Sequence, residues 1–218
     1  MAAYDLFATN QYWVVAGFNM DFEEELPFWS EEIQVEIWIS EVSKLKIYTD
    51  FKIYHDNKVF SKGNALWFII DKETKRPIRA DIVSERFEIC NELVLGEHKK
   101  FELPEKTDIY NQITHQNNLS DLDFNNHVNN KSYINLADMT TKTDFKETHQ
   151  LKQLNIKFNK ETFLGDVLKC ITYNSVNSDT LVHIVEKDGE SVCDITTEWT
   201  KRKNTLKIEN ATLKVQAE

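Results

Sequence analysis

The chain has 218 residues, of which 41% are hydrophobic and 28% are charged. This balance is typical of one large globular domain or two small ones, and it excludes a wholly disordered chain. The formal net charge is −10 and the pI is about 5.2. These values argue against a general nucleic-acid-binding protein, because phosphate binding requires a concentrated positive surface.

The cysteines and the N-terminal sequence indicate the compartment. Cys90, Cys170 and Cys193 are far apart and form no CxxC pair, which favours reduced thiols over a disulfide scaffold or a zinc site. The first residues, MAAYDLFATN, lack the basic region and apolar core of a signal peptide. No apolar run approaches the length of a membrane span. We therefore expect a cytoplasmic protein without a membrane span.

Alternation of apolar and polar residues with a period of two predicts strands along much of the chain. The runs are QVEIWIS (34–40), IYTDFKIYHD (47–56), NALWFIID (64–71), KQLNIKF (152–158), DVLKCITY (166–173) and TLVHIVE (180–186). In the first run, Val35, Ile37 and Ile39 should share one face of a sheet.

The strand pattern occurs twice. The turn dipeptides Asp56-Asn57 and Asp188-Gly189 lie 132 positions apart (188 − 56), and each precedes a tryptophan by eleven positions. The second is a strong signal for a type I′ hairpin. Segments 28–39 and 163–173 also resemble each other, at an offset of 135 (163 − 28). We predict a duplicated β-rich unit, with chance similarity between amphipathic strands as the alternative.

The two halves differ at their starts. The second half has a strand-like stretch, DIYNQIT (108–114), and a helix-like segment before its paired strands. Subtracting the offset places the equivalent helix of the first half before or at residue 1. We therefore expect either an abbreviated first unit or a chain that begins late relative to a longer gene product.

The segment DFNNHVNN (123–130) concentrates hydrogen-bonding side chains immediately before a predicted helix. Asn129 or Asn130 can cap the first turn of this helix. The N–H groups around Val128, Asn129 and Asn130 would point out of the helix start with partial positive charge, which can stabilise an oxyanion. The expected buried stripe comprises Val128, Tyr133, Ile134, Leu136 and Ala137.

Three different functional groups precede the helix. Asp123, Asn125 and His127 alternate, so an extended backbone would present their side chains on one side. Asn125 can donate to a carbonyl oxygen, His127 can transfer a proton near neutral pH, and Asp123 can orient the imidazole or a water. Glu161 is the candidate for a further carboxylate. The structural alternative is an Asn-rich turn with a partly exposed histidine and no catalytic role.

These residues carry a resemblance to a known family. The pattern DxNxHVNNxxY, at 123–133, resembles the hallmark of the acyl-acyl carrier protein (acyl-ACP) thioesterases of plants and bacteria. Segments 12–15, 28–51 and 67–79 are similar to that family's N-terminal unit. LKQLNIKFNKET (151–162) is similar to the segment that bears its essential carboxylate, which falls on Glu161.

The resemblance implies a fold of the α+β class. The expected fold is a double hot-dog, in which two antiparallel sheets each wrap a central helix, with the first unit lacking its usual N-terminal strand and helix. The N-terminal unit would span residues 1–104, and the C-terminal unit, residues 105–218, would carry the catalytic residues. Loss of the first helix would expose apolar surface.

The resemblance also implies an activity. Asp123, Asn125, His127 and Glu161 would form a polar catalytic network that hydrolyses the thioester of acyl-ACP in fatty acid biosynthesis, releasing free fatty acid and the carrier thiol. No metal or organic cofactor is implied, and pairing of two chains into a homodimer is compatible with the family. Thr162 stands where plant members often have cysteine, which favours attack by water. Glu161 or His127 would activate that water, and a transient acyl-Asp123 remains open.

Positive residues gather in and after the run DKETKRPIR (71–79) of this acidic chain. They are Lys72, Lys75, Arg76, Arg79 and, further on, Arg86. Because acyl carrier proteins are acidic, such a patch would steer docking. The alternative is a solvated hairpin tip.

Two rival functions follow from the same residues. One is hydrolysis of acyl-coenzyme A, which a comparison of matched carrier-protein and coenzyme A thioesters separates. The other is a non-catalytic acyl-ligand binding or sensor protein, which would bind acyl chains without releasing thiol.

Overall fold

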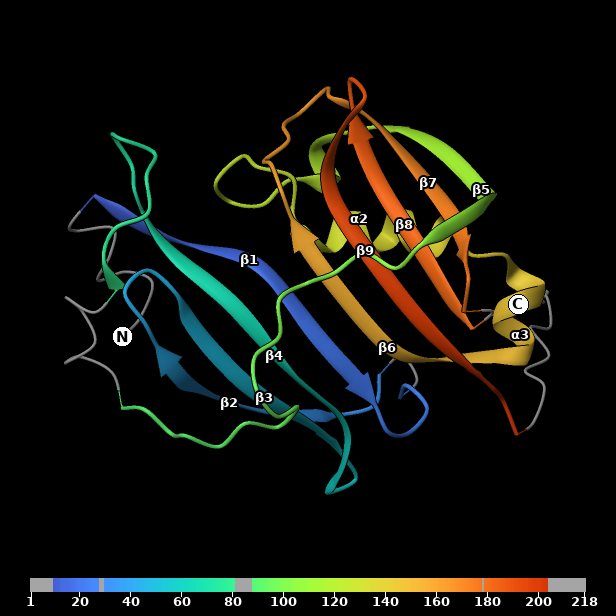
Figure 1. The fold of residues 1–218 in the computed structure, drawn as a ribbon, viewed down its shortest axis with the longest axis horizontal. Coiled ribbons are helices and arrows are strands. Elements are labelled where there is room, and N and C mark those ends of the chain that lie inside the picture. Colours follow the sequence, from blue (N-terminus) through green and yellow to red (C-terminus); the bar gives the residue numbers. More distant parts are fainter. Residues whose placement is uncertain (1–9, 28–29, 81–87, 178, 204–218) are drawn as a thin grey trace, which may run out of the picture.

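The computed structural model describes residues 10–27, 30–80, 88–177 and 179–203 (Figure 1). Arg86 of the basic run lies outside these ranges. The strands are β1 (Gln11–Phe22), β2 (Ile33–Val42), β3 (Ile47–His55), β4 (Lys58–Asp71), β5 (Lys106–Gln116), β6 (His149–Phe158), β7 (Val167–Ser175), β8 (Thr180–Lys187) and β9 (Glu190–Lys201). The helices are the 3₁₀ turn η2 (Leu119–Asp121), α2 (Asn130–Thr140) and α3 (Thr143–Thr148).

The described strands form one antiparallel nine-stranded sheet, in the order β2-β3-β4-β1-β6-β9-β8-β7-β5. The order β2-β3-β4-β1 is mirrored by β7-β8-β9-β6, so the two halves meet where β1 pairs with β6. The turns at Asp56-Asn57 and Asp188-Gly189 join β3 to β4 and β8 to β9, and all four residues have the positive φ of a type I′ hairpin. The predicted duplication is confirmed, and the two expected sheets are continuous with each other.

Helix α2 covers one face of the second half of the sheet (Figure 1). The Asn129 side chain caps it by accepting a hydrogen bond from the Lys131 N–H at 2.9 Å, so Asn129 is the cap of the two candidates. The stripe of the helix is buried as expected, with Ile134 only partly covered. It packs on the main core cluster, which includes Leu154, Ile156, Leu168, Cys170, Val185, Cys193 and Ile195.

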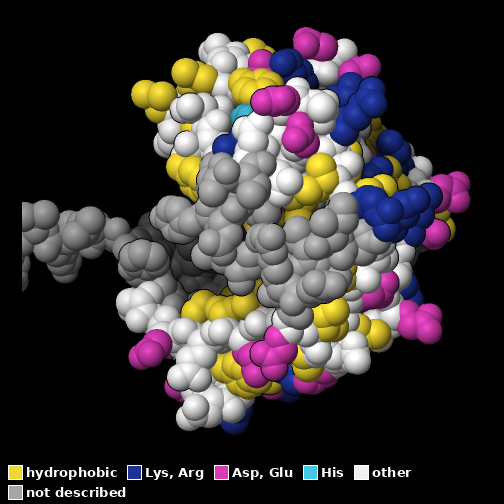
Figure 2. Space-filling view, turned by 90° about the vertical axis from the view of Figure 1, so that its left-hand side faces the viewer, with side chains coloured by type: hydrophobic (Ala, Val, Ile, Leu, Met, Phe, Trp, Pro, Cys, Tyr) yellow, Lys and Arg dark blue, Asp and Glu magenta, His cyan; other side chains and the backbone are white. Residues whose placement is uncertain are grey.

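No helix covers the sheet in the described residues of the first half. Ile33, Val35 and Ile37 of β2 are therefore 46%, 58% and 59% exposed. Figure 2, which views the molecule from the side of this half, shows hydrophobic side chains at the surface among acidic ones. The residues 135 positions later (168 − 33) are fully buried, each 0% exposed, on the face that contacts α2: Leu168, Cys170 and Thr172.

This matched pair of strands gives a stability prediction. Leu168→Ala should lower the free energy of unfolding by about 2–5 kcal/mol, because it leaves a cavity beneath α2. Ile33→Ala should cost less than about 1 kcal/mol, since much of its side chain already contacts water. Urea unfolding of the two variants measures both changes, and an equal cost would mean that Ile33 is covered in solution.

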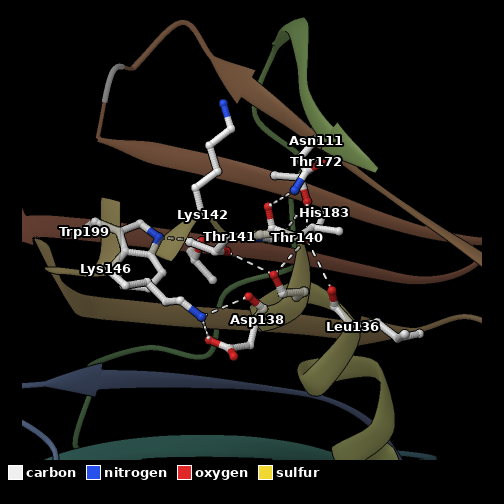
Figure 3. Close-up of polar contacts among 12 residues, drawn as sticks. Asn111, Leu136, Asp138, Thr140, Thr141, Lys142, Lys146, Thr172, His183 and Trp199 are labelled. Atoms are coloured by element: carbon white, nitrogen blue, oxygen red, sulfur yellow. Dashed lines mark hydrogen bonds and ion pairs between the residues drawn. The ribbon is translucent and has the colours of Figure 1, made fainter. Parts of the chain in front are cut away.

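A buried polar chain fastens the end of α2 to the sheet (Figure 3). With its proton on Nδ1, the neutral His183 ring donates to Thr172 Oγ1 at 2.7 Å, and Thr172 Oγ1 donates to Thr140 Oγ1 at 2.6 Å. Thr140 Oγ1 in turn donates to the Ala137 carbonyl, 2.8 Å away. On the other side, His183 Nε2 lies 2.9 Å from Thr197 Oγ1. Burial lowers the pKa of His183 to about 3.

This depressed pKa gives a dependence of stability on pH. In the unfolded chain His183 titrates near its usual pKa of about 6.5. Below that pH only the unfolded state takes up the proton, so the contribution of His183 to stability falls as the pH decreases from about 6.5 toward the folded pKa of about 3. The slope due to this residue is at most about 1.4 kcal/mol per pH unit.

The variant His183→Gln tests this prediction, because glutamine keeps a hydrogen-bond donor and an acceptor but does not titrate. The free energy of unfolding of the variant, measured at pH 7 to 4.5, should depend less steeply on pH than that of the wild type. Identical slopes would contradict a buried, neutral His183.

Candidate active site

The segment before α2 is a tight turn. The Asp123 N–H donates to the His127 carbonyl at 2.8 Å, and Asp123 Oδ1 accepts the N–H groups of Asn125 and His127 at 2.8 and 3.2 Å. Asn126 has a φ of +61°. The expectation of an extended segment with alternating side chains is therefore wrong, because the Asp123 carboxylate captures the two amides and folds the chain back.

A backbone hydrogen bond holds this turn against the loop after β6. The Val128 N–H donates to the Thr162 carbonyl at 2.9 Å. The Thr162 side chain is fully buried, and its Oγ1 lies 2.7 Å from the Tyr133 hydroxyl of α2. Burial, the largest effect, raises the pKa of Tyr133 to about 12, so this hydroxyl stays protonated. Together these contacts form a clamp between residues 128, 133 and 162.

The clamp places His127 beside Glu161. His127 Nδ1 lies 3.7 Å from Glu161 Oε1, and the two side chains are 28% and 45% exposed. The His127 ring also packs edge-to-face against the Phe163 ring, with the ring centroids 5.3 Å apart and the ring planes at 78°. A carboxylate and an imidazole at this separation, both within reach of solvent, can share the proton of a water that binds between them.

These residues line a cavity of roughly 490 Å³ between the two halves. Asp123, Asn125, His127 and Glu161 all contribute to its wall, so the structure brings the predicted polar set to one cavity. Of these four side chains, all of which the structure describes, only those of His127 and Glu161 form a direct pair. The opposite wall comes from the first half and includes Tyr12, Trp13, Val15, Trp67 and Phe68.

Tyr12 is a site residue that the sequence analysis missed. Its pKa is raised, first by burial and then by the negative charge of Glu161, which lines the same cavity. Tyr12 lies in YWVV (12–15), a stretch noted for its resemblance alone. Its place in the same cavity as Glu161 could not be found from one sequence, because 149 positions (161 − 12) separate the two residues.

The helix start offers fewer donors than expected. The Val128 N–H is taken by Thr162, and the Asn129 N–H donates to the Asp121 carbonyl at 2.7 Å. The expectation that these two amides face an oxyanion is therefore not met, because both are used to hold the turn. Among the described residues, the Asn130 N–H has no hydrogen-bond partner, and Asn130 lines the cavity.

The basic run forms a turn after β4, close to the cavity. Asp71 Oδ1 accepts the N–H groups of Glu73 and Thr74 at 3.1 and 2.8 Å, which fixes the turn. The side chains of Lys75, Arg76 and Arg79 are exposed, whereas Lys72 is partly buried. Lys75 Nζ lies 5.5 Å from the centroid of the Tyr12 ring, so the turn is next to the wall of the cavity.

Other titratable groups lie apart from this site. In the part of the chain that the structure describes, no group of three or more His, Cys, Asp or Glu side chains could hold a metal ion. His115 is paired with Asp121 at 2.8 Å, and His149 is stacked on Phe145. Among the described helices, none has the length and apolar character needed to cross a membrane.

Comparison with known proteins identifies the family. The acyl-ACP thioesterase N-terminal domain matches residues 2–87, and the acyl-ACP thioesterase C-terminal domain matches residues 105–201. The chain therefore belongs to the acyl-ACP thioesterase family.

Two curated relatives are plant proteins. The palmitoyl-acyl carrier protein thioesterase, chloroplastic, of Arabidopsis thaliana is 25% identical over 178 residues, which cover 77% of this chain and 42% of that protein. The oleoyl-acyl carrier protein thioesterase, chloroplastic, of Coriandrum sativum is 23% identical over 185 residues, or 78% and 49% of the two chains. The chain thus spans less than half the length of these relatives.

Solved structures agree on the fold. An acyl-ACP thioesterase from Bacteroides thetaiotaomicron superposes with a TM-score of 0.79 at 22% identity, over 91% of this chain and 81% of that one. The 12:0-ACP thioesterase from Umbellularia californica gives a TM-score of 0.76 at 21% identity, over 91% and 78%. The predicted double hot-dog fold is confirmed.

Proposed function

We propose that this chain hydrolyses the thioester of acyl-ACP and releases free fatty acid and the carrier thiol, as a step of fatty acid biosynthesis. The observation that carries the proposal is the pairing of His127 with Glu161 at 3.7 Å in a cavity between the two halves. Membership of the acyl-ACP thioesterase family supports the same activity.

In the proposed mechanism, water attacks the thioester carbonyl. Glu161 and His127 share the role of base, and the imidazole receives the proton of the water as the new C–O bond forms. The resulting imidazolium is stabilised by the Glu161 carboxylate. It returns the proton to the sulfur when the C–S bond breaks, so the products are a carboxylic acid and a thiol.

The negative charge that develops on the carbonyl oxygen needs donors. We assign this role to the Asn130 N–H at the start of α2 and to the side-chain amide of Asn125, both of which line the cavity. Asp123 has a positioning role, because its Oδ1 accepts two backbone N–H groups and fixes the turn that carries His127. Those hydrogen bonds stabilise the carboxylate and disfavour an acyl-Asp123 intermediate.

Removing either member of the pair should reduce turnover. Glu161→Gln and His127→Ala should each lower kcat on an acyl-ACP by about 100- to 10,000-fold, since general acid–base catalysis contributes that much. Thiol release measured at saturating substrate checks this, with the exposed Glu105→Gln as the control for a lost carboxylate. Wild-type turnover in both site variants would show that the chemistry is elsewhere.

We further propose that the basic turn after β4 docks the acidic carrier protein. The double variant Lys75→Glu/Arg76→Glu should raise KM for acyl-ACP by on the order of tenfold at low salt, with a smaller effect at high salt, because exposed charges act mainly on association. KM for the matched acyl-CoA should not change. A control pair, Lys58→Glu/Lys169→Glu, alters the net charge equally at other exposed positions.

These measurements also separate the rival functions. Equal turnover on carrier-protein and coenzyme A thioesters, with no effect of the basic turn, would favour an acyl-CoA thioesterase. Tight binding of acyl chains without thiol release would favour a sensor. We also propose that the boundary between the two units follows residue 104 and that two chains form a homodimer. A measurement of the mass of the protein in solution tests the homodimer.

A further inference from the structure

A second cavity lies on the face of the sheet opposite α2. Residues 88–105, the linker segment, cross this face (Figure 1). They are fastened by the Val94 N–H, which donates to Asp50 Oδ1 at 2.9 Å, and by His98, whose ring stacks on Tyr48 with centroids 4.0 Å apart. Beneath the linker segment is a cavity of roughly 540 Å³, the linker cavity, whose walls include Leu66, Phe68 and Phe101.

The charged side chains that line the linker cavity itself are lysines, although Lys99 and Lys100 also line an adjoining pocket with Asp21, Glu97 and Glu102. Four lysines line it and, among the described lining residues, no carboxylate does. None of the four forms an ion pair with another described residue. These lysines are Lys46, Lys99, Lys100 and Lys157. In a chain of net charge −10, this arrangement favours an anionic ligand.

The wall also has a buried polar atom without a partner. The His98 side chain is only 4% exposed. Its Nε2 lies 3.3 Å from Ser40 Oγ and 3.7 Å from Asp50 Oδ2. Its Nδ1 has no hydrogen-bond partner among the described residues. Buried polar atoms in proteins are nearly always paired, so His98 Nδ1 is an unsatisfied group, shielded from solvent, in a residue that lines the cavity.

The linker cavity and the candidate active site meet at a gap in the sheet. β1 pairs with β4 from Gln11 onward, but it pairs with β6 only from Gly17 to Asp21. A Cβ on Gly17 would lie 2.4 Å from the Ile156 carbonyl oxygen, so the backbones touch there before the strands separate. A bulge at Ala16 marks the point of separation. Four residues around the gap line both cavities: Ala16, Phe68, Phe158 and Asn159.

We propose that the linker cavity binds the phosphate end of the phosphopantetheine arm of the substrate, while the thioester at the other end reaches His127 and Glu161 through the gap beside Ala16. This rests on the proposed function, because that arm carries the thioester. The arm has a phosphate at one end and sulfur at the other, so holding the phosphate on Lys99 and Lys100 limits where the carbonyl can lie. Carrier protein and coenzyme A share this chemistry.

A binding experiment tests the site without relying on hydrolysis. By calorimetry, 4′-phosphopantetheine should bind the wild-type chain at least about tenfold more tightly than pantetheine, which lacks the phosphate. Lys99→Glu/Lys100→Glu should abolish this difference, and Lys99→Arg/Lys100→Arg should retain it. The control Lys58→Glu/Lys169→Glu has the same change in net charge and should bind as the wild type does.

Kinetics then separate this inference from the proposed function. With an acyl-phosphopantetheine thioester, Lys99→Glu/Lys100→Glu should lower kcat/KM by on the order of tenfold. With the acyl-pantetheine thioester, which has no phosphate, the same variant should match the wild type. Hydrolysis of both thioesters with no advantage from the phosphate would overturn the linker-cavity site and leave the function intact.

Two further outcomes are informative. If neither thioester is hydrolysed, the proposed function fails, and the calorimetric comparison of phosphopantetheine with pantetheine still decides the binding site. A different result would be that dodecanoate binds the wild type but not Lys99→Glu/Lys100→Glu, and that phosphopantetheine does not bind. The cavity would then bind a fatty carboxylate, and the phosphate assignment would be wrong.

Discussion

The candidate site depends on one backbone hydrogen bond, from the Val128 N–H to the Thr162 carbonyl. His127 and Glu161 belong to different loops, 34 positions apart (161 − 127), and each directly adjoins one partner of this bond. The bond is supported by the Tyr133–Thr162 hydroxyl contact in a buried setting, where water does not compete. Without it, the Asx turn at Asp123 would keep its own shape, but the backbone contact that fixes its distance from Glu161 would be lost.

The same strand order produces two different halves because only one half has a helix in the described residues. In the second half, α2 turns the apolar face into a core and supplies Tyr133 and the Asn130 N–H. In the first half, β2 leaves apolar side chains in solvent, and the aromatic residues near the start of β1 become the wall of a cavity. The cavities form at the junction because β1 follows β4 along its length and β6 over only a part.

The two buried histidines, His183 and His98, differ in whether their ring nitrogens have hydrogen-bond partners. Every ring nitrogen of His183 is paired within a chain of threonines, and this chain secures α2 to the sheet. His98 is almost as buried, but its Nδ1 and the nearby Asp50 Oδ2 lack hydrogen-bond partners among the described residues. A satisfied network stabilises the fold, whereas unsatisfied buried polar groups lower its stability.

The sequence by itself predicted the described strands other than β1 and β9, the two hairpins and the duplication, because alternation and turn dipeptides act through the local backbone. Its resemblance to a family gave the polar set around His127 and Glu161. It could not give the turn at Asp123, the use of the Val128 and Asn129 amides, or the place of Tyr12 opposite Glu161. The tertiary structure decided these, since each depends on a contact between residues remote in the chain or on which acceptor an amide finds after folding.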